Sequence, residues 1–345
     1  MRHSVIRSLS NPAASSFRES PVKILAIRFA RLGDVILLMP ALAALKDRFP
    51  DSELTLLTGH RCAPIAELCP AIDQVIAVDR IAMRDGPAWR ALRDMIGLVR
   101  NVRQRRFDIA IDFHSFRETN LLTWLSGAPV RVGMKRYQAP FLGFCFNTPP
   151  ILEDKALHVA EMFRKVAEAA AGGTMGPCKR SIIGNLAAHA RSKADIVLFV
   201  DAPVPERIWP PERFAEVADF ASEKLGAKVA VVSSTERPNL ADRVQKASRN
   251  PHQLLVFTDL TLPRLAALIA SAQLLISNDT GPMHIGPAVG VPTLALFSVG
   301  YPEHFRPIGE HDRFLRAMPI EDIETQKVIE TLEQMWTTAG RDLRR

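Results

Sequence analysis

The chain has 345 residues, of which 47% are hydrophobic and 23% charged, a globular composition that excludes a collagen-like or disordered chain. At ~150 residues per domain, this length predicts about two domains. Lys and Arg number 44 against 37 Asp and Glu, an excess that indicates an anionic partner without choosing among nucleic acid, phosphosugar and lipid headgroup. No apolar run reaches the ~18 residues of a membrane-spanning helix.

The N-terminal segment and the cysteines indicate where the protein works. Residues 1–21 are basic and serine-rich and contain no apolar stretch typical of a secretory signal. We expect a disordered basic tail, with an organellar transit peptide as the alternative. The four cysteines show no CxxC spacing, so neither a disulfide framework nor a zinc site is indicated, and a reducing cytosol is the simplest location.

The first half of the chain alternates short β-type runs with longer helical patterns. An apolar run over residues 35–45, interrupted by Pro40, predicts a buried helix. The predicted strands cover residues 22–27, 54–58, 75–78 and 108–111, and the predicted helices cover 40–48 and 89–106.

The same alternation restarts in the second half. Predicted strands cover 196–200, 229–232, 254–257, 274–277 and 293–297, with helices at 211–224, 239–248, 262–271 and 321–336. Such alternation predicts βαβ units, hence an α/β fold with two doubly wound parallel sheets that bind ligands at the carboxyl ends of their strands. The predicted divisions are 22–178, a linker at 179–193, 194–325, and a C-terminal helix and tail at 326–345.

The sharpest motif is the stretch Asn278-Asp279-Thr280-Gly281-Pro282-Met283-His284, which follows a predicted strand. Pro282 suits the first helical position, and Thr280 or Gly281 suits the cap. The unpaired amides of such a first turn form an anion site, to which Thr280 and His284 can add donors. Asp279 could bond a sugar hydroxyl, orient the loop or hold a cation. Alternatively, the motif is only a well-capped helix with Asp279 in an Asx turn.

A second motif, Arg28-Phe29-Ala30-Arg31-Leu32-Gly33-Asp34, follows the first predicted strand. Gly33 permits close approach of the backbone to a ligand. Asp34 lies near a helix start, where it is either a plain N-cap or a general base facing the ligand crevice.

Two further loops in the second half carry weaker signals. Arg207 could pair with a phosphate or be an ordinary surface arginine. Ser233 and Glu236 belong to a polar loop after a predicted strand and could bond a ribose.

The helical pattern at 89–106 has an apolar stripe at Leu92, Met95, Ile96, Val99 and Val102. Seven arginines against two aspartates over residues 81–106 give this segment a charge of 7 − 2 = +5. The simpler interpretation is the solvated face of a helix packed on the core. The functional interpretation is a patch that meets anionic lipid or an acceptor phosphate.

Several motifs are absent from the sequence: GxxxxGK[ST], GxGxxG after a strand, GxSxG and HExxH. Their absence disfavours P-loop NTPases, ordinary dinucleotide enzymes, α/β hydrolases and zincins. The positive charge also has no accompanying nucleic-acid-binding motif.

The residues resemble a known family. Leu32-Gly33-Asp34 followed by Pro40-Ala41-Leu42 is similar to the N-terminal signature of the heptosyltransferases, glycosyltransferase family 9. Residues 259–269 and 278–284 resemble that family's C-terminal donor signature, and residues 209–214 and 158–159 fit it too. The similarity covers residues 22–325.

This resemblance implies a GT-B fold, in which two Rossmann-like domains face each other across a cleft. It implies a nucleotide-sugar donor, usually ADP-L-glycero-D-manno-heptose, and an anionic lipid-linked acceptor, the inner core of lipopolysaccharide (lipid A–Kdo type). The expected protein is a cytoplasmic monomer, peripheral at the inner leaflet of the inner membrane, that needs no metal or other cofactor and binds no nucleic acid.

The resemblance also assigns roles to residues. Asp34 is the base, the Thr280–Gly281 backbone and His284 hold the diphosphate, and Asp279 is the donor-site aspartate. Arg207 matches a Lys or Arg that pairs with phosphate. The remaining donor candidates are Gly33, Ser233, Glu236, Pro282 and Met283, and the acceptor candidates are Arg31, Arg117, Arg131, Lys135 and Arg136.

The sequence departs from the family pattern in three places. The family's Asp-x-Gln-Gly reads Asp112-Phe113-His114-Ser115 here, Gly-Pro-Thr-Asp-Pro reads 298-SVGYP-302, and a His-Pro-Gly-like loop reads 201-DAP-203. We expect inverting transfer, in which the acceptor hydroxyl attacks the anomeric carbon as the nucleoside diphosphate leaves. The alternatives are a related transferase with another donor or acceptor, a nucleotide-sugar 2-epimerase, and a non-catalytic glycan-binding scaffold.

Overall fold

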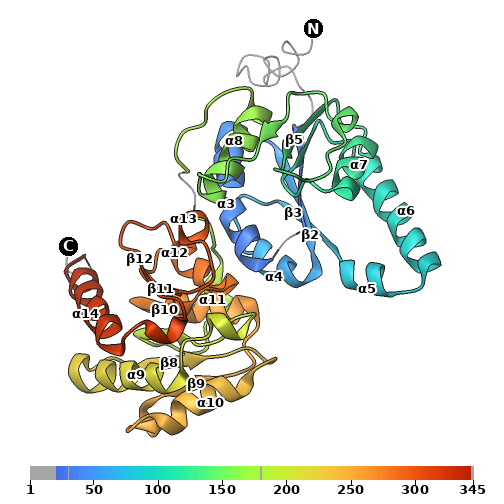
Figure 1. Cartoon of the computed structure of the whole chain (residues 1–345). Coiled ribbons are helices and arrows are strands. Elements are labelled where there is room, and N and C mark those ends of the chain that lie inside the picture. The colour runs from blue at the N-terminus through green and yellow to red at the C-terminus, as the bar shows by residue number, and fades with distance from the viewer. Residues whose placement is uncertain (1–20, 30, 179–180, 343–345) are drawn as a thin grey trace. The chain divides into compact units, whose positions relative to one another are not determined.

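The computed structural model describes residues 21–29, 31–178 and 181–342. The chain divides into two compact units, residues 1–182 and 183–345, each built on its own sheet (Figure 1). The division falls inside the segment predicted as a linker. Except for Pro21, the predicted tail at 1–21 lies outside the described residues.

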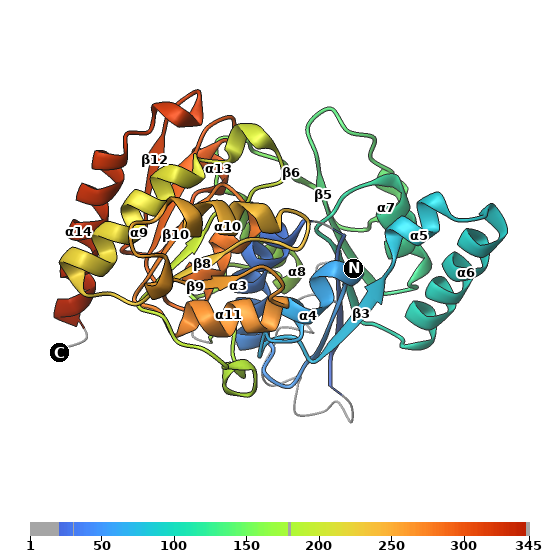
Figure 2. The same cartoon turned by 90° about the horizontal axis from the view of Figure 1, so that it is seen from below.

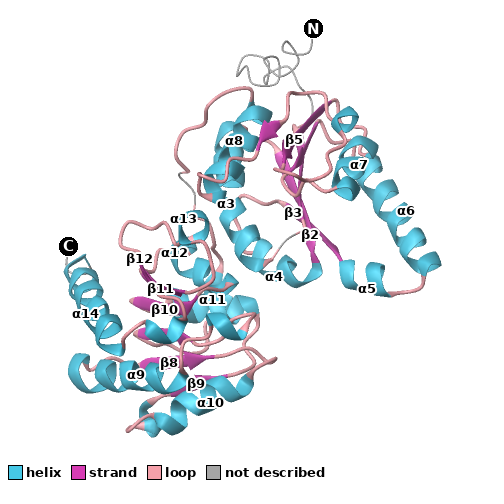
Figure 3. Cartoon of the chain, in the orientation of Figure 1, coloured by secondary structure: helices cyan, strands magenta, loops and turns pink. Residues whose placement is uncertain are grey.

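The N-terminal unit contains a six-stranded sheet of order β3-β2-β1-β4-β5-β6, and its strand pairs are parallel. Helices α3 and α8 pack together on one face, while α6 and α7 cover the other (Figure 3). The strands are β1 (Lys23–Arg28), β2 (Glu53–Gly59), β3 (Gln74–Val78), β4 (Ile109–Asp112), β5 (Val130–Lys135) and β6 (Ile151–Leu152). The helices are α3 (Leu32–Arg48), α4 (Ala63–Ala66), α5 (Arg80–Asp85), α6 (Ala88–Gln104), α7 (Arg117–Leu125) and α8 (Val159–Ala171).

Helix α3 is apolar on nearly all sides, as expected for a helix enclosed between a sheet and α8. It runs through Pro40, and residues on both sides of the proline, such as Leu38 and Leu42, are fully buried. The buried helix predicted over residues 35–45 is therefore confirmed, although it begins at Leu32, three residues before that run and eight before the helical pattern predicted at 40–48.

Helix α6 departs from the simpler prediction. Val102 belongs to the core, and Leu98 and Val99 pack against it. The N-terminal half of the same apolar stripe, however, is exposed at Leu92 and Ile96. The interpretation of a wholly core-packed helix is therefore wrong for this half, because no neighbouring element of the described chain covers it.

The C-terminal unit repeats the architecture with the order β12-β11-β10-β7-β8-β9, again in parallel pairs. Its strands are β7 (Ile196–Phe199), β8 (Val229–Val232), β9 (Leu255–Phe257), β10 (Leu274–Asn278), β11 (Thr293–Phe297) and β12 (Arg313–Arg316). Its helices are α9 (Pro211–Leu225), α10 (Pro238–Ala247), α11 (Leu262–Ala270), α12 (Ile285–Ala288), α13 (Pro302–Phe305) and α14 (Thr325–Asp342).

The predicted C-terminal helix packs on the core of this unit. Val328, Leu332 and Met335 of α14 lie in the same core cluster as Phe214 of α9. The strands β5, β6 and β12 and the helices α4, α5, α7, α8 and α13 had no counterpart among the sequence predictions. No helix of the described residues is long and apolar enough to cross a membrane.

Candidate functional site

Each sheet has one position where the strand order reverses, and each candidate motif lies there. In the N-terminal unit this position is between β1 and β4, and in the C-terminal unit between β7 and β10. Loops leaving the carboxyl ends of such strands diverge to opposite faces and open a ligand crevice. The motif 28–34 follows β1, and the motif 278–284 begins at the end of β10.

Asp34 is not the N-cap of its helix. Arg31 occupies the cap position without a side-chain capping bond, and Asp34 lies in the first turn after it, next to Gly33. The Asp34 carboxylate instead pairs with the Arg28 guanidinium at 3.0 Å. The plain N-cap interpretation is therefore wrong, and the carboxylate faces the crevice-forming end of β1.

Arg28 ends β1 and is almost completely buried. It donates to the carbonyl of Phe113 at 2.6 Å and lies over the ring of Phe163 at 4.9 Å. Burial lowers the pKa of Arg28 and the charge of Arg136 lowers it further, whereas Asp34 opposes both effects. The Arg28 Nε atom has no hydrogen-bond partner among the described residues. The Arg28–Asp34 pair therefore holds the carboxylate in place.

Two further arginines and a histidine gather beside this pair. Arg80, which begins α5, donates to the carbonyl of Phe29 at 3.2 Å and lies 3.5 Å from His114 Nε2. Arg136 follows β5 and lies over the ring of Phe116 at 5.1 Å. Burial, together with the surrounding guanidinium charges, lowers the pKa of His114 to about 3, so its imidazole is neutral at physiological pH. We call the three arginines Arg28, Arg80 and Arg136, together with the neutral His114 beside them, the cationic cluster.

Asp112 shapes the loop that carries His114. Its Oδ1 accepts the amides of His114 and Ser115 at 2.9 and 2.8 Å, and its Oδ2 accepts the Asn120 side chain at 2.8 Å. Burial raises the pKa of Asp112 despite these hydrogen bonds. Ser115 has a φ of 60°, a left-handed conformation that glycine adopts most easily. This explains why the related motif ends in glycine and shows that the departure at Ser115 leaves the turn intact.

The acceptor candidates fall into different environments. Arg136 belongs to the cationic cluster, while Arg31, Arg117 and Lys135 are exposed. Arg131 near the start of β5 donates to the carbonyls of Cys145 and Ala128 at 2.8 and 2.7 Å. The structure therefore gives Arg131 a structural role instead of the predicted one, because its guanidinium is engaged away from the carboxyl end of the strand.

In the C-terminal unit, Arg207 and Asp279 meet at the reversal point. The guanidinium of Arg207 lies 3.1 Å from Asp279 Oδ2, and the buried Nε atom of Arg207 has no hydrogen-bond partner among the described residues. A β-carbon added to Gly300 would lie 2.1 Å from the same Asp279 oxygen, so a larger residue at this position would have to displace the Asp279 carboxylate. Of the three roles considered for Asp279, orienting the loop is the one that its contacts with Arg207 and Gly300 favour.

Asn278 joins the two loops at this edge. Its side chain donates to the carbonyl of Val200 at 2.9 Å and accepts the amide of Trp209 at 3.2 Å. Trp209 is fully buried, and its indole donates to the carbonyl of Ile323 at 3.0 Å. The residues that resemble the family signature at 209 and 278 therefore fix the loop that carries Arg207.

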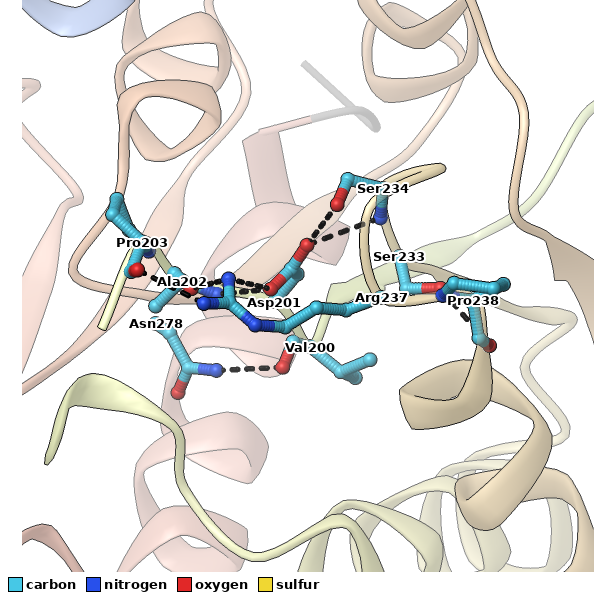
Figure 4. Close-up of polar contacts among 9 residues, drawn as sticks. All are labelled: Val200, Asp201, Ala202, Pro203, Ser233, Ser234, Arg237, Pro238 and Asn278. Atoms are coloured by element: carbon cyan, nitrogen blue, oxygen red, sulfur yellow. Dashed lines mark hydrogen bonds and ion pairs between the residues drawn. The ribbon is translucent and has the colours of Figure 1, made fainter. Parts of the chain in front are cut away.

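A neighbouring group of hydrogen bonds among Asp201, Ser234 and Arg237 joins the loops after β7 and β8 (Figure 4). Asp201 accepts hydrogen bonds from the Ser234 hydroxyl and from Arg237, the latter at 3.2 Å. Arg237 also donates to the carbonyl of Pro203 at 3.0 Å. The predicted donor candidate Ser233 is buried, and its hydroxyl lies 3.4 Å from the Pro238 carbonyl. Its side chain therefore braces α10, whereas Glu236 in the same loop is exposed.

The segment after Asp279 differs from the predicted helix. Thr280 is the cap, as predicted, but it makes no side-chain capping bond, and only a single 3₁₀ turn (Gly281–His284) and the short α12 follow. The helix dipole here is therefore much weaker than expected, although the first-turn amides remain. Met283 is completely buried with Ala295 and Phe297, so the structure places its side chain in the core rather than toward a donor. Thr280, Gly281 and Pro282 are partly exposed, and His284 is buried.

Comparison with known proteins decides the family. The family model for glycosyltransferase family 9 (heptosyltransferase) matches residues 95–335, more than half of the chain. The chain belongs to glycosyltransferase family 9.

Individual relatives agree with this assignment. The chain is 22% identical over 283 residues to lipopolysaccharide heptosyltransferase 3 of Escherichia coli, covering 77% of this chain and 80% of that protein. A family 9 glycosyltransferase from Veillonella parvula has a TM-score of 0.76 at 24% identity, covering 92% of this chain and 97% of that one. The E. coli heptosyltransferase WaaC, solved with ADP, has a TM-score of 0.79 at 18% identity, covering 91% and 100%.

These findings confirm the predicted family, the α/β fold class of GT-B enzymes and the expectation of a glycosyltransferase. Within the described residues, no group of three or more His, Cys, Asp or Glu side chains could hold a metal ion.

Sequence reasoning missed Arg28, Arg80 and Arg237. Arg28 was visible as a charged residue ending an apolar strand, a signal that could have pointed to the site. Arg80 and Arg237 carried no such signal.

Proposed function

We propose that this enzyme transfers a heptose, with inversion, from ADP-heptose to the phosphorylated inner core of a lipopolysaccharide precursor of the lipid A–Kdo type. The observation that carries the proposal is the Asp34 carboxylate, held 3.0 Å from Arg28 beside the cationic cluster. A carboxylate can take the proton of an acceptor hydroxyl, and clustered guanidinium groups suit an acceptor rich in phosphate and carboxylate. The names of the relatives support this choice of donor and acceptor.

In the proposed reaction, Asp34 removes the proton of the acceptor hydroxyl as its oxygen bonds to the anomeric carbon of the heptose. The bond from that carbon to the diphosphate oxygen breaks, and ADP leaves with the electron pair. Arg28 orients the carboxylate, and the cationic cluster holds the anionic groups of the acceptor. Most of the rate then comes from positioning the two substrates.

The C-terminal unit supplies the groups that we assign to the donor. Arg207, oriented by Asp279 at 3.1 Å, the first-turn amides after Thr280 and the His284 side chain stabilise the departing diphosphate. These groups take the part that a divalent cation plays in other transferases, and we propose that transfer needs no metal or other cofactor. We further propose a monomeric enzyme that acts at the cytoplasmic face of the inner membrane, where its lipid-linked acceptor resides, and that binds no nucleic acid.

The test is a product assay by mass spectrometry with purified protein, ADP-heptose and a lipid A–Kdo acceptor. Asp34→Asn preserves the size of the side chain but removes the base, so transfer should fall about 10²–10⁴-fold while ADP still binds. The control is Asp51→Asn, at an exposed carboxylate outside the site, which should leave turnover unchanged. Near-normal turnover by the Asp34 variant would overturn the assignment of the base.

The same assay separates the alternatives. Conversion of ADP-heptose without acceptor would favour an epimerase, and turnover with a different nucleotide sugar would refute the proposed donor. Failure to bind any nucleotide sugar would favour a glycan-binding scaffold.

A further inference from the structure

Helix α6 exposes an apolar strip that the proposed chemistry does not use. Trp89, Leu92 and Ile96 are 61%, 62% and 56% exposed, and their spacing of three and seven residues places them on one side of the helix. Met95 beside them is 42% exposed. Soluble proteins seldom leave contiguous large apolar side chains in water, and such patches mark sites of interaction. We call these four residues the α6 strip.

The strip is bordered by positive charge. Arg93 and Arg100 are exposed and follow Trp89 and Ile96 by four residues, so they lie beside the strip. Arg90 and Arg93 also lie over the Trp89 ring at 5.1 and 5.8 Å. Asp94, the single acidic residue of the helix Ala88–Gln104, pairs with Arg93 at 2.9 Å.

The position of the helix makes this half accessible. The C-terminal half of α6 is anchored, because Val102 lies in the core and Leu98 and Val99 pack on it. The N-terminal half projects with α5 beyond the sheet of its own unit, as two perpendicular views show (Figures 1 and 2). An anchored helix with a free apolar end can insert that end shallowly without unfolding.

We propose that the α6 strip docks the enzyme on an anionic lipid bilayer. Helices that lie in a membrane surface combine large apolar residues, tryptophan among them, with a basic polar edge, and arginine side chains can extend from the apolar face to the headgroups. Self-association through this surface would instead bring the arginines of two copies together. The charge of the strip therefore favours a bilayer over a second copy of the chain.

Docking here would serve the active site of the same unit. The segment that leads into the strip starts at Arg80, which belongs to the cationic cluster and contacts the Phe29 carbonyl at 3.2 Å. The purpose of docking rests on the proposed function, since a lipid-linked acceptor lies in that bilayer. The docking itself rests only on the chemistry of α6.

The experiment is flotation of the full chain with vesicles of phosphatidylethanolamine alone or mixed with phosphatidylglycerol, without nucleotide sugar or acceptor. The wild type should bind the anionic vesicles, and binding should weaken with salt. The triple variant Trp89→Ser/Leu92→Ser/Ile96→Ser should lose about tenfold or more of this affinity. A matched control places serine at three exposed apolar positions of the C-terminal unit, Tyr301, Ile308 and Met318, and should bind like the wild type.

The charge contribution is tested separately. Arg93→Gln/Arg100→Gln should lose about fivefold per arginine, roughly 25-fold in all, while Lys246→Gln/Arg264→Gln, at exposed positions of the C-terminal unit, should show no specific loss. Trp89→Phe offers a readout free of folding defects, because the vesicle-induced blue shift of tryptophan fluorescence should largely disappear.

Three results would overturn the proposal: no binding of the wild type to anionic vesicles, equal binding by the triple variant, or self-association that the triple variant abolishes without any vesicle binding. An error in the proposed function would give a different set of results. If wild-type protein docks but never transfers heptose to a soluble deacylated acceptor, the donor or acceptor is wrong and docking stands. If both proposals hold, the triple variant should keep activity on the soluble acceptor and lose it on acceptor embedded in vesicles.

Discussion

Acidification should destabilise the N-terminal unit through one buried side chain, His114. Burial and three nearby guanidinium groups lower the pKa of its imidazole from 6.5 to about 3. Between these values the unfolded chain binds a proton that the folded chain does not. Stability attributable to His114 is therefore complete above about pH 6.5 and is lost progressively as the pH falls toward about 3.

The size of the effect follows from the same values. Each pH unit below 6.5 costs the native state about 1.4 kcal/mol. Between about pH 7 and pH 5, the N-terminal unit should therefore lose about 2 kcal/mol. His114 is only 6% exposed, so solvent screens the interaction weakly. His114→Gln, which carries the amide found in the related motif and stays neutral at every pH, should not show this loss.

Hydrogen exchange can measure this loss of stability in the N-terminal unit alone. The slowest amides of β1 and β4 report the opening free energy of the N-terminal unit once intrinsic exchange rates are corrected. Burial also raises the pKa of Asp112. This residue titrates in both the wild type and His114→Gln, so its contribution to the pH dependence cancels when the two proteins are compared. His252→Gln, at an exposed position of the C-terminal unit, should behave like the wild type. An equal loss in wild type and His114→Gln would refute the reasoning.

Three substitutions test the other contacts. Arg207→Ala should weaken ADP binding about 10–100-fold by calorimetry, since charged hydrogen bonds contribute about 1.5–3 kcal/mol. The control Arg264→Ala, at an exposed position, should bind ADP like the wild type. Unchanged affinity of the Arg207 variant would show that Arg207 is not part of the donor site. Gly300→Ala would place a β-carbon 2.1 Å from Asp279 Oδ2 and should also weaken ADP binding by displacing that carboxylate, an effect that normal affinity would contradict. Asp112→Asn should lower the free energy of unfolding by about 1–3 kcal/mol in a denaturant titration, because an oxygen that accepts a hydrogen bond from a buried donor is replaced by an amide nitrogen that donates. An unchanged denaturation midpoint would show that the stability of the loop does not depend on the Asp112 carboxylate.

Local sequence determined most of the scaffold. Runs of β-branched and aliphatic residues predicted nine of the twelve strands in the described part of the chain, because burial on both faces of a parallel sheet requires apolar side chains at consecutive positions. Alternation with helices then predicted the parallel arrangement, and parallel strands bring their carboxyl ends to one edge. The order of the elements was therefore enough to predict that the motifs at 28–34 and 278–284 lie at ligand-binding edges.

The grouping of side chains within each edge depended on the tertiary structure. Arg28, Arg80, His114 and Arg136 lie at or just after the carboxyl ends of four different strands, and nothing in their spacing along the chain brings them together. The same limit explains Arg131 and Met283, whose side chains turn to backbone carbonyls and to the core.

Helix α6 shows most clearly what the sequence determined and what the tertiary structure decided. Its periodicity determined that one side would be apolar, because a helix repeats every 3.6 residues. Only the packed fold decided that Val102 lies in the core while Leu92 and Ile96 remain exposed. A repeat along the chain specifies which residues share a face, whereas what covers that face depends on elements distant in sequence.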